Sequence, residues 1–169
     1  MEKFSIKANT YTLLKSSFDE SAKALLANEN KYMVPIFQRP YSWENGIVSN
    51  FIRDLTDSYQ LSKQDSADAD LFIGTMQIRK KKDVFEIIDG QQRITTLLLL
   101  LKVLSQHIQH ISYTWLSTEV NNGTQQKSLS EALNFDLSKE IGENKSNLYL
   151  TNLKYIKELA EEIIEELAD

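Results

Sequence analysis

The stretch Val84-Phe85-Glu86-Ile87-Ile88-Asp89-Gly90-Gln91-Gln92-Arg93-Ile94-Thr95-Thr96-Leu97 changes its hydrophobic period in the middle, and this change decides the fold. Residues 84–88 are rich in apolar and β-branched side chains, which is typical of a β-strand. From Ile94 to Ile111 the apolar residues follow helical spacing instead. The sequence therefore predicts a tight turn from strand to helix at Asp89-Gly90.

Further strands are expected before this turn. Residues 71–79 and 84–88 are predicted to pair as a β-hairpin, which residues 80–83 join. Residues 31–36 are predicted to form another strand, in which Pro35 marks either a sheet edge or the end of the strand.

Three more helices are predicted. Ser17-Phe18-Asp19-Glu20 resembles a capping box that opens a short helix, and Ser42 can cap a second one. Residues 146–168 are expected to form a final amphipathic helix, whereas residues 112–145 are weakly patterned apart from a turn at 121–123. The second helix is predicted to bury one stripe of residues that recur every four positions: Trp43, Ile47, Phe51, Leu55 and Tyr59.

The apolar residues of the final helix alternate steps of four and three, as in a heptad seam, while glutamates occupy its other faces. The seam either packs on its own domain or forms an interface, with a second copy in a homo-oligomer or with a C-terminal domain. The interface is the prediction. The seam consists of Tyr149, Leu153, Ile156, Ala160, Ile163 and Leu167.

Composition excludes several function classes. The chain has no cysteine, which rules out disulfides, thiolate chemistry and cysteine-based zinc sites and fits the predicted cytoplasmic location. It has no apolar run of about 18 residues and no signal-peptide pattern, so no membrane span is predicted. The net charge of −5 argues against a DNA binder that uses its whole surface, although local basic patches remain compatible with it.

The predicted turn has the chemistry of an anion site. The start of a helix carries unpaired N–H groups and the positive end of the helix dipole, where phosphates bind readily. Gly90 would let a ligand approach the backbone closely. Arg93 offers a fork of donors suited to phosphate, and Gln91 and Gln92 can donate and accept. The alternative is that Asp89 merely caps the helix and the polar residues form a solvated first turn.

Three segments resemble the N-terminal domain of GmrSD-type, modification-dependent restriction endonucleases, in the same order and at similar spacing. This family looks like a relative of the ParB and sulfiredoxin fold. The resemblance implies an α+β fold in which helices pack on a small mixed β-sheet, with the C-terminal amphipathic helix in addition. The segments are Val34-Pro35-Ile36-Phe37-Gln38-Arg39-Pro40-Tyr41-Ser42-Trp43, Phe72-Ile73-Gly74-Thr75-Met76 and residues 87–97.

The resemblance implies a nucleotide-binding domain that hydrolyses a nucleoside triphosphate (NTP) with Mg²⁺ and regulates cleavage of modified phage DNA. Asp89, Gln91, Gln92 and Arg93 would be catalytic. Asp89 would hold the metal or orient the attacking water. A nuclease domain on the same or another chain is the expected partner. The nucleotide would be bound by Gln38, Arg39, Gly90, Gln92 and Arg93.

The domain division implied is a ParB-like domain at 1–111 that carries the Asp-Gly-Gln-Gln-Arg motif, followed by a helical extension at 112–169. The extension could stop short of a C-terminal domain. Sulfiredoxin chemistry is impossible without cysteine, and no P-loop is present, so any NTPase would be of another type. The resemblance also implies that full-length members often carry an HNH-type nuclease domain, but this chain has no matching motif, since His107 and His110 are its only histidines.

Some alternatives stay open. The turn could bind DNA phosphates and sense modification without turnover. Arg39 could pack on Trp43 through a cation–π contact instead of binding phosphate. The cations at 79–82 could contact DNA or form a solvated turn. His107 and His110 lie three residues apart, which is weak evidence for a metal site without a third ligand.

Overall fold

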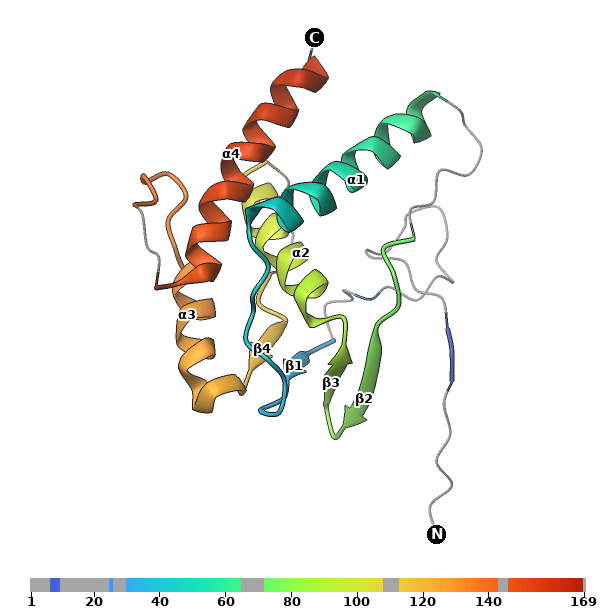
Figure 1. Ribbon diagram of the computed structural model, residues 1–169, viewed down its shortest axis with the longest axis vertical. Coiled ribbons are helices and arrows are strands. Elements are labelled where there is room, and N and C mark those ends of the chain that lie inside the picture. The colour runs from blue at the N-terminus through green and yellow to red at the C-terminus, as the bar shows by residue number, and fades with distance from the viewer. Residues whose placement is uncertain are drawn as a thin grey trace.

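The computed structural model describes residues 7–9, 25, 30–64, 72–107, 113–142 and 146–168. Apart from Leu25, the helix predicted from Ser17 lies outside these residues. The described chain forms helices and one sheet (Figure 1). In order, the elements are β1 (Tyr32–Val34), α1 (Asn45–Gln64), β2 (Gln77–Lys81), β3 (Val84–Asp89), α2 (Gln91–Leu104), β4 (Leu116–Thr118), the short 3₁₀ turn η1 (Val120–Gly123), α3 (Thr124–Leu133) and α4 (Leu148–Ala168).

The sheet is mixed and has the strand order β2-β3-β1-β4. β1 runs parallel to β3 and to β4, and β2 pairs antiparallel with β3. The predicted α+β fold with a small mixed sheet is confirmed. Because three strands run in the same direction, their carboxyl ends meet at one edge of the sheet, where ligands of open α/β sheets bind. β1 lies inside the sheet, so Pro35 marks the strand end and not an edge.

The hairpin is shorter at its first strand than predicted. β2 begins at Gln77 and not at residue 71, because Gly74 adopts a left-handed backbone with φ of 100° that interrupts an extended run. At the other end, Lys80 and Lys81 belong to the strand. The turn is therefore formed by Lys82 and Asp83 alone.

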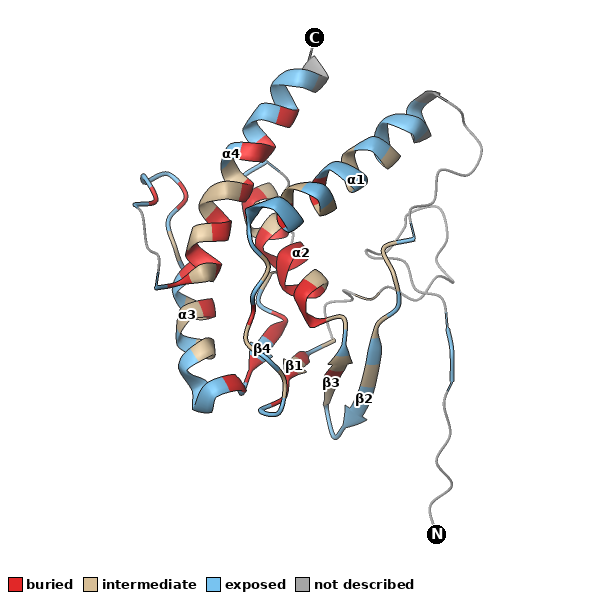
Figure 2. Ribbon diagram, in the orientation of Figure 1, coloured by how far each residue is buried: buried red, intermediate tan, exposed pale blue. Residues whose placement is uncertain are grey.

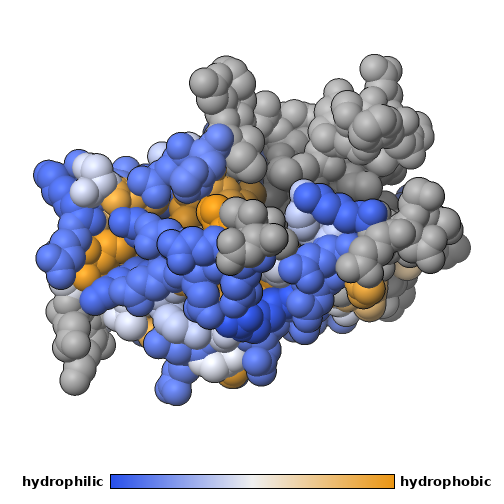
Figure 3. All heavy atoms as spheres, turned by 90° about the horizontal axis from the view of Figure 1, so that it is seen from above, coloured by the Kyte–Doolittle hydropathy of each residue, from blue (hydrophilic) through white to orange (hydrophobic). Residues whose placement is uncertain are grey.

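Helix α4 buries its apolar seam from Tyr149 to Ile163 within the chain. Leu153 and Ile156 are fully buried, and α4 packs against α1, α2 and α3 (Figures 1 and 2). The alternative that this helix packs on its own domain is confirmed, and the prediction of an interface along the seam is wrong. The periodicity identifies an apolar face but not the surface that covers it. Seen from above, the described surface is mostly hydrophilic, with smaller hydrophobic areas between the polar side chains (Figure 3).

The buried face of α1 differs from the predicted stripe. Val48 and Ile52 are buried, whereas Ile47 and Tyr59 are about half exposed. A step of four residues turns a helix of 3.6 residues per turn by more than one full circle, so a strict four-residue repeat drifts around the helix axis. Tyr59 is exposed for a second reason, since the far half of α1 extends away from α4 (Figure 1).

The weakly patterned region contains β4, η1 and α3, which sequence reasoning did not predict apart from the turn at 121–123. β4 is an edge strand of the same sheet, and α3 packs against α4. Residues on both sides of the predicted boundary at 111 thus contribute to one sheet and one core. Among the helices that the structure describes, none is long and apolar enough to cross a membrane.

Candidate functional site

The candidate site lies where the carboxyl ends of the parallel strands converge. β1 leads into the segment 35–44, β3 leads into the Asp89-Gly90 turn, and β4 leads into η1. The N–H of Glu119 donates to the carbonyl of Val34 (2.8 Å), which joins the ends of β4 and β1. A small cavity of about 10 Å³ lies among these ends and is lined by residues that include Arg39, Tyr41, Gln91, Gln92 and Thr118.

The predicted turn is present. Asp89 ends β3 with an exposed side chain, and Gly90 occupies the N-cap position of α2 with a left-handed φ of 94°. No side chain caps the helix, so the alternative that Asp89 is merely the cap is wrong. The first N–H groups of α2 therefore lack both an intrahelical acceptor and a side-chain cap. A side chain at residue 90 would contact Met76, so the space beside Gly90 faces the protein and not a ligand. The left-handed φ therefore explains the glycine better than ligand access does.

The two glutamines are buried, so the alternative of a solvated first turn is also wrong for them. Gln91 donates its side-chain amide to the carbonyl of Arg39 (3.0 Å). Gln92 donates to the carbonyl of Pro40 (3.1 Å) and accepts from the N–H of Ser42 (2.9 Å). Their acceptors are main-chain atoms that would otherwise be unpaired. Together the glutamines fasten the segment after β1 to the start of α2.

Gln38 adds a third connection of the same kind. Its side-chain amide donates to the carbonyl of Ile88 (2.8 Å), the residue just before Asp89. The segment after β1 is thus tied to the end of β3 as well as to α2. Gln38 was predicted to bind nucleotide, and the structure places it as a support of the turn.

Arg93 is also engaged. Its Nη1 donates to the carbonyl of Ile73 (2.8 Å) and its Nη2 to the carbonyl of Thr75 (2.7 Å). These bonds hold the segment before β2 against the first turn of α2. The guanidinium still has N–H groups beyond the two that these bonds use. Arg93 is half-buried, in contrast to the predicted free fork.

Glu119 directly follows β4 and is exposed at this edge, and two further free charges there are Asp89 and Arg39. Both side chains are exposed, and no described residue pairs with either of them. The cation–π alternative for Arg39 is not found among the described residues, and Trp43 instead packs edge-on against Phe51 (5.5 Å between ring centroids). Arg39, Gln91 and Gln92 line the same cavity, whereas Asp89 and Arg93 are not among its lining residues.

A buried polar network behind the cavity was missed by sequence reasoning. The Tyr41 hydroxyl bonds to Thr96 (2.8 Å), and Asn152 of α4 donates to Tyr41 (3.0 Å) and to the carbonyl of Trp43 (2.7 Å). Burial raises the pKa of Tyr41 to about 12, although the hydrogen bonds from Thr96 and Asn152 oppose the shift. The detectable signal was Asn152, a polar residue among the apolar positions of α4.

The described residues contain no group of three or more histidine, aspartate or glutamate side chains that could hold a metal ion. Magnesium needs fewer protein ligands when it is bound together with a nucleotide, since one or two carboxylates plus phosphate oxygens suffice. The exposed and unpaired Asp89 carboxylate fits that requirement. His107 is exposed after α2, and His110 lies outside the described residues.

Comparison with known families gives one finding. A family model described as the N-terminal domain of the GmrSD restriction endonuclease matches residues 22–168, which is most of the chain. A search of curated proteins finds no match.

Proposed function

Because the chain belongs to the family of GmrSD restriction endonuclease N-terminal domains, we propose that it binds and hydrolyses a nucleoside triphosphate and thereby regulates a cytoplasmic restriction enzyme directed at modified DNA. The site is the edge of the sheet formed by Asp89, Arg39 and the start of α2. One observation carries the proposal. The carboxylate of Asp89 is exposed and unpaired directly before a helix that no side chain caps.

This geometry supports phosphate binding. The unpaired N–H groups and the positive dipole end of α2 favour an anion at the helix start. The exposed guanidinium of Arg39 supplies a second donor from the segment that Gln91 fastens to α2. The cavity of about 10 Å³ has room for about one water molecule. The nucleotide would therefore lie over the exposed rim of this edge and not inside the fold.

Asp89 would contribute to hydrolysis of the nucleotide and not to the affinity for it. A carboxylate beside a phosphate is repulsive unless a cation lies between them. Mg²⁺ bound with the nucleotide would supply that charge and neutralise the phosphate oxygens. Asp89 is then placed to hold the ion, directly or through water, or to orient the attacking water.

Gln91, Gln92 and Arg93 are positioning residues in this proposal. Each uses its side chain to hold a segment next to the turn, so each acts on the nucleotide through Arg39 or through the shape of the rim. This assignment differs from direct catalysis by all three residues, which was predicted from the sequence.

The alternative is a module that binds DNA phosphates at the same turn without turnover. The exposed Asp89 carboxylate disfavours it, because a pure phosphate clamp gains nothing from a negative charge there. In either case a nuclease domain belongs to the proposal, and it would respond to the nucleotide in the first function and to the bound DNA in the second.

Phosphate release separates the two functions. Each common ribonucleoside triphosphate is incubated with the protein and Mg²⁺, with and without modified DNA. The proposal predicts release by the wild type and its loss in Asp89→Asn. The matched control is Asp83→Asn, at the opposite end of β3, which should retain release. Absence of release by the wild type under all conditions, or equal release by Asp89→Asn, would contradict hydrolysis at this site.

A further inference from the structure

We propose that the tip of the β2–β3 hairpin contacts the phosphate backbone of duplex DNA. This basic tip consists of Arg79, Lys80, Lys81 and Lys82. The proposal rests on the DNA-directed part of the proposed function but not on nucleotide binding at Asp89. It concerns a different surface, since the tip lies at the start of β3 and Asp89 at its end.

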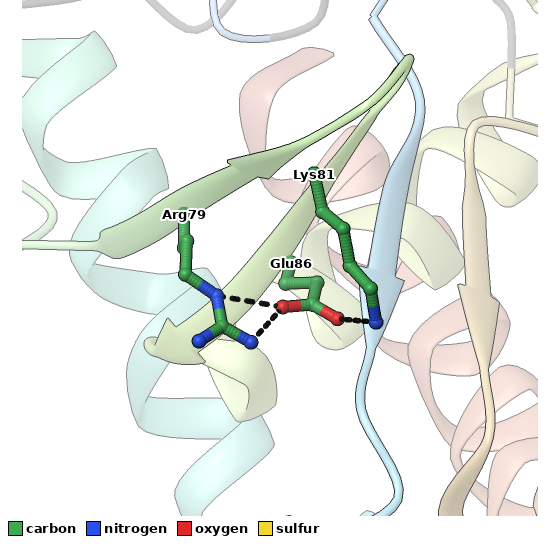
Figure 4. A network of polar contacts seen from close by, with 3 residues as sticks. All are labelled: Arg79, Lys81 and Glu86. Carbon is green, nitrogen blue, oxygen red and sulfur yellow. Dashed lines mark hydrogen bonds and ion pairs between the residues drawn. The ribbon is translucent and has the colours of Figure 1, made fainter. Parts of the chain in front are cut away.

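Two of the cations are held in place by a buried carboxylate (Figure 4). Arg79 donates to Glu86 from Nε (2.9 Å) and from Nη2, and Lys81 donates to the other oxygen of Glu86 from Nζ (2.8 Å). The Glu86 side chain is 2% exposed, whereas those of Arg79 and Lys81 are 61% and 59% exposed. One buried carboxylate thus orders two long side chains that remain more than half exposed.

This order favours anion binding. Long basic side chains lose much conformational freedom when they bind a partner, and side chains that are already ordered lose less. Arg79 and Lys81 lie two residues apart on one face of an edge strand, so they are separated by roughly 7 Å along it. One carboxylate balances only one of the two charges. This face therefore keeps a net positive charge.

The other two cations extend the charge around the hairpin. Lys80 lies over the ring of Phe85, with 5.9 Å from Nζ to the ring centroid, and Lys82 is at the turn. Cations are therefore present on both faces and at the end of a two-stranded ribbon. The major groove of DNA admits a two-stranded β-ribbon, and phosphates line both of its walls.

The backbone at Lys82 is a second, independent observation. Its φ of 55° is left-handed, a conformation that glycine and asparagine adopt more readily than lysine does. Residues kept in disfavoured conformations are typical of functional positions. The turn therefore carries a lysine where a glycine would fit the backbone better.

The composition of the tip favours DNA over a protein partner. Lysine is depleted in the centres of protein interfaces, which are apolar and aromatic. The basic tip has four adjacent cations, and the strand β2 that leads into it, Gln77–Lys81, includes one apolar side chain. A second copy of the chain, docking through the exposed glutamates of α4, is the competing occupant, and the test below distinguishes it.

The test measures binding of a fluorescent duplex of about 30 base pairs over a series of salt concentrations. The double variant Lys80→Ala/Lys82→Ala should bind more weakly, and the slope of log K against log salt should fall by ~1.8, about 0.9 for each phosphate that the protein no longer neutralises. The matched control, Lys127→Ala/Lys139→Ala, removes two exposed lysines elsewhere and should retain the wild-type slope. Equal slopes for both double variants would overturn the proposal.

Lys82→Gly distinguishes the effect of the left-handed backbone on stability from the effect of the lysine charge on DNA binding. It should raise the melting temperature, because glycine accepts the left-handed turn, and should weaken DNA binding. A raised melting temperature with unchanged DNA affinity would overturn the proposal. Self-association of the wild type, seen as concentration-dependent light scattering and abolished in the tip variants, would also overturn the proposal, since the tip would then bind a second copy of the chain. Nucleotide-dependent phosphate release without DNA should be unchanged in Lys82→Gly, so a failure of the tip is distinguishable from a failure of the nucleotide site.

Discussion

The guanidinium of Arg93 lies beside the Cα of Gly74 and donates to the carbonyls on both sides of that glycine. Gly74 has a φ of 100°, and a side chain at this position would overlap with Arg93 Nη1. The arginine of the turn motif and the glycine before β2 therefore form one structural unit. This unit explains both residues without a ligand.

Arg93→Ala is expected to lower the free energy of unfolding by about 1–3 kcal/mol, because two carbonyls lose a charged donor. Urea denaturation measures the change. Arg53→Ala is the control. Its side chain is exposed and pairs with Glu162 at 3.1 Å, and such surface pairs contribute about 0–1 kcal/mol. If the two variants lose equal stability, the bonds of Arg93 contribute no more than a surface ion pair.

Gly74→Ala should destabilise the wild type through the left-handed φ and through the overlap with Arg93. In an Arg93→Ala background only the backbone strain remains, so the second substitution should cost less there than in the wild type. A double-mutant cycle measures this coupling. Additive effects would show that the two residues do not share one space.

The acid stability of the fold should depend on Glu86. Hydrogen bonds from Lys81 and then from Arg79 hold the pKa of this carboxyl below its usual value of 4.5, although burial opposes them. A carboxyl whose pKa is lowered in the folded state stabilises the fold above pH 4.5, and this contribution is lost as the pH falls through the folded pKa.

Thermal unfolding of the wild type and of Glu86→Gln should therefore differ most above pH 4.5 and converge below it. The exposed Glu119 offers a control, since no described charged residue pairs with it. Glu119→Gln should follow the wild type over the whole range. A constant difference between wild type and Glu86→Gln at all pH values would contradict the assigned role of the ion pairs.

Gln92 should affect nucleotide binding through Arg39. Gln92→Met leaves the carbonyl of Pro40 and the N–H of Ser42 without their partner, which loosens the segment that carries Arg39. Nucleotide affinity should fall in Gln92→Met but show no further fall when Arg39→Ala is already present. Independent, additive losses would mean that Gln92 contacts the nucleotide directly.

Hydrophobic patterns in the sequence predicted those elements that depend only on residues close together in the chain. The period change at Asp89 and the amphipathic pattern of α4 involve neighbouring residues, and both elements are present. The strand β4 is three residues long and lies in the weakly patterned region, where no apolar run marks it as β1 is marked. Its pairing with β1 is a long-range contact that no local pattern contains.

The sequence located the turn from strand to helix but not the contacts that its side chains make. The turn lies where it was predicted, and the main chain of Arg39 lies next to it. The burial of Gln91 and Gln92 could not be predicted, because their partners are main-chain atoms about 50 residues away. Polar side chains at a helix start look the same in sequence whether they bind a ligand or another loop.

Calorimetric titration of Mg²⁺ and each ribonucleoside triphosphate into wild type, Arg39→Ala and Arg53→Ala tests nucleotide binding at the Asp89 edge most directly. Both arginines are exposed, so both variants should fold, which circular dichroism checks. A charge-assisted hydrogen bond is worth about 1.5–3 kcal/mol, so Arg39→Ala should bind roughly tenfold to a hundredfold more weakly, while Arg53→Ala should match the wild type. Wild-type affinity in a folded Arg39→Ala protein, or no binding to the wild type, would contradict the account.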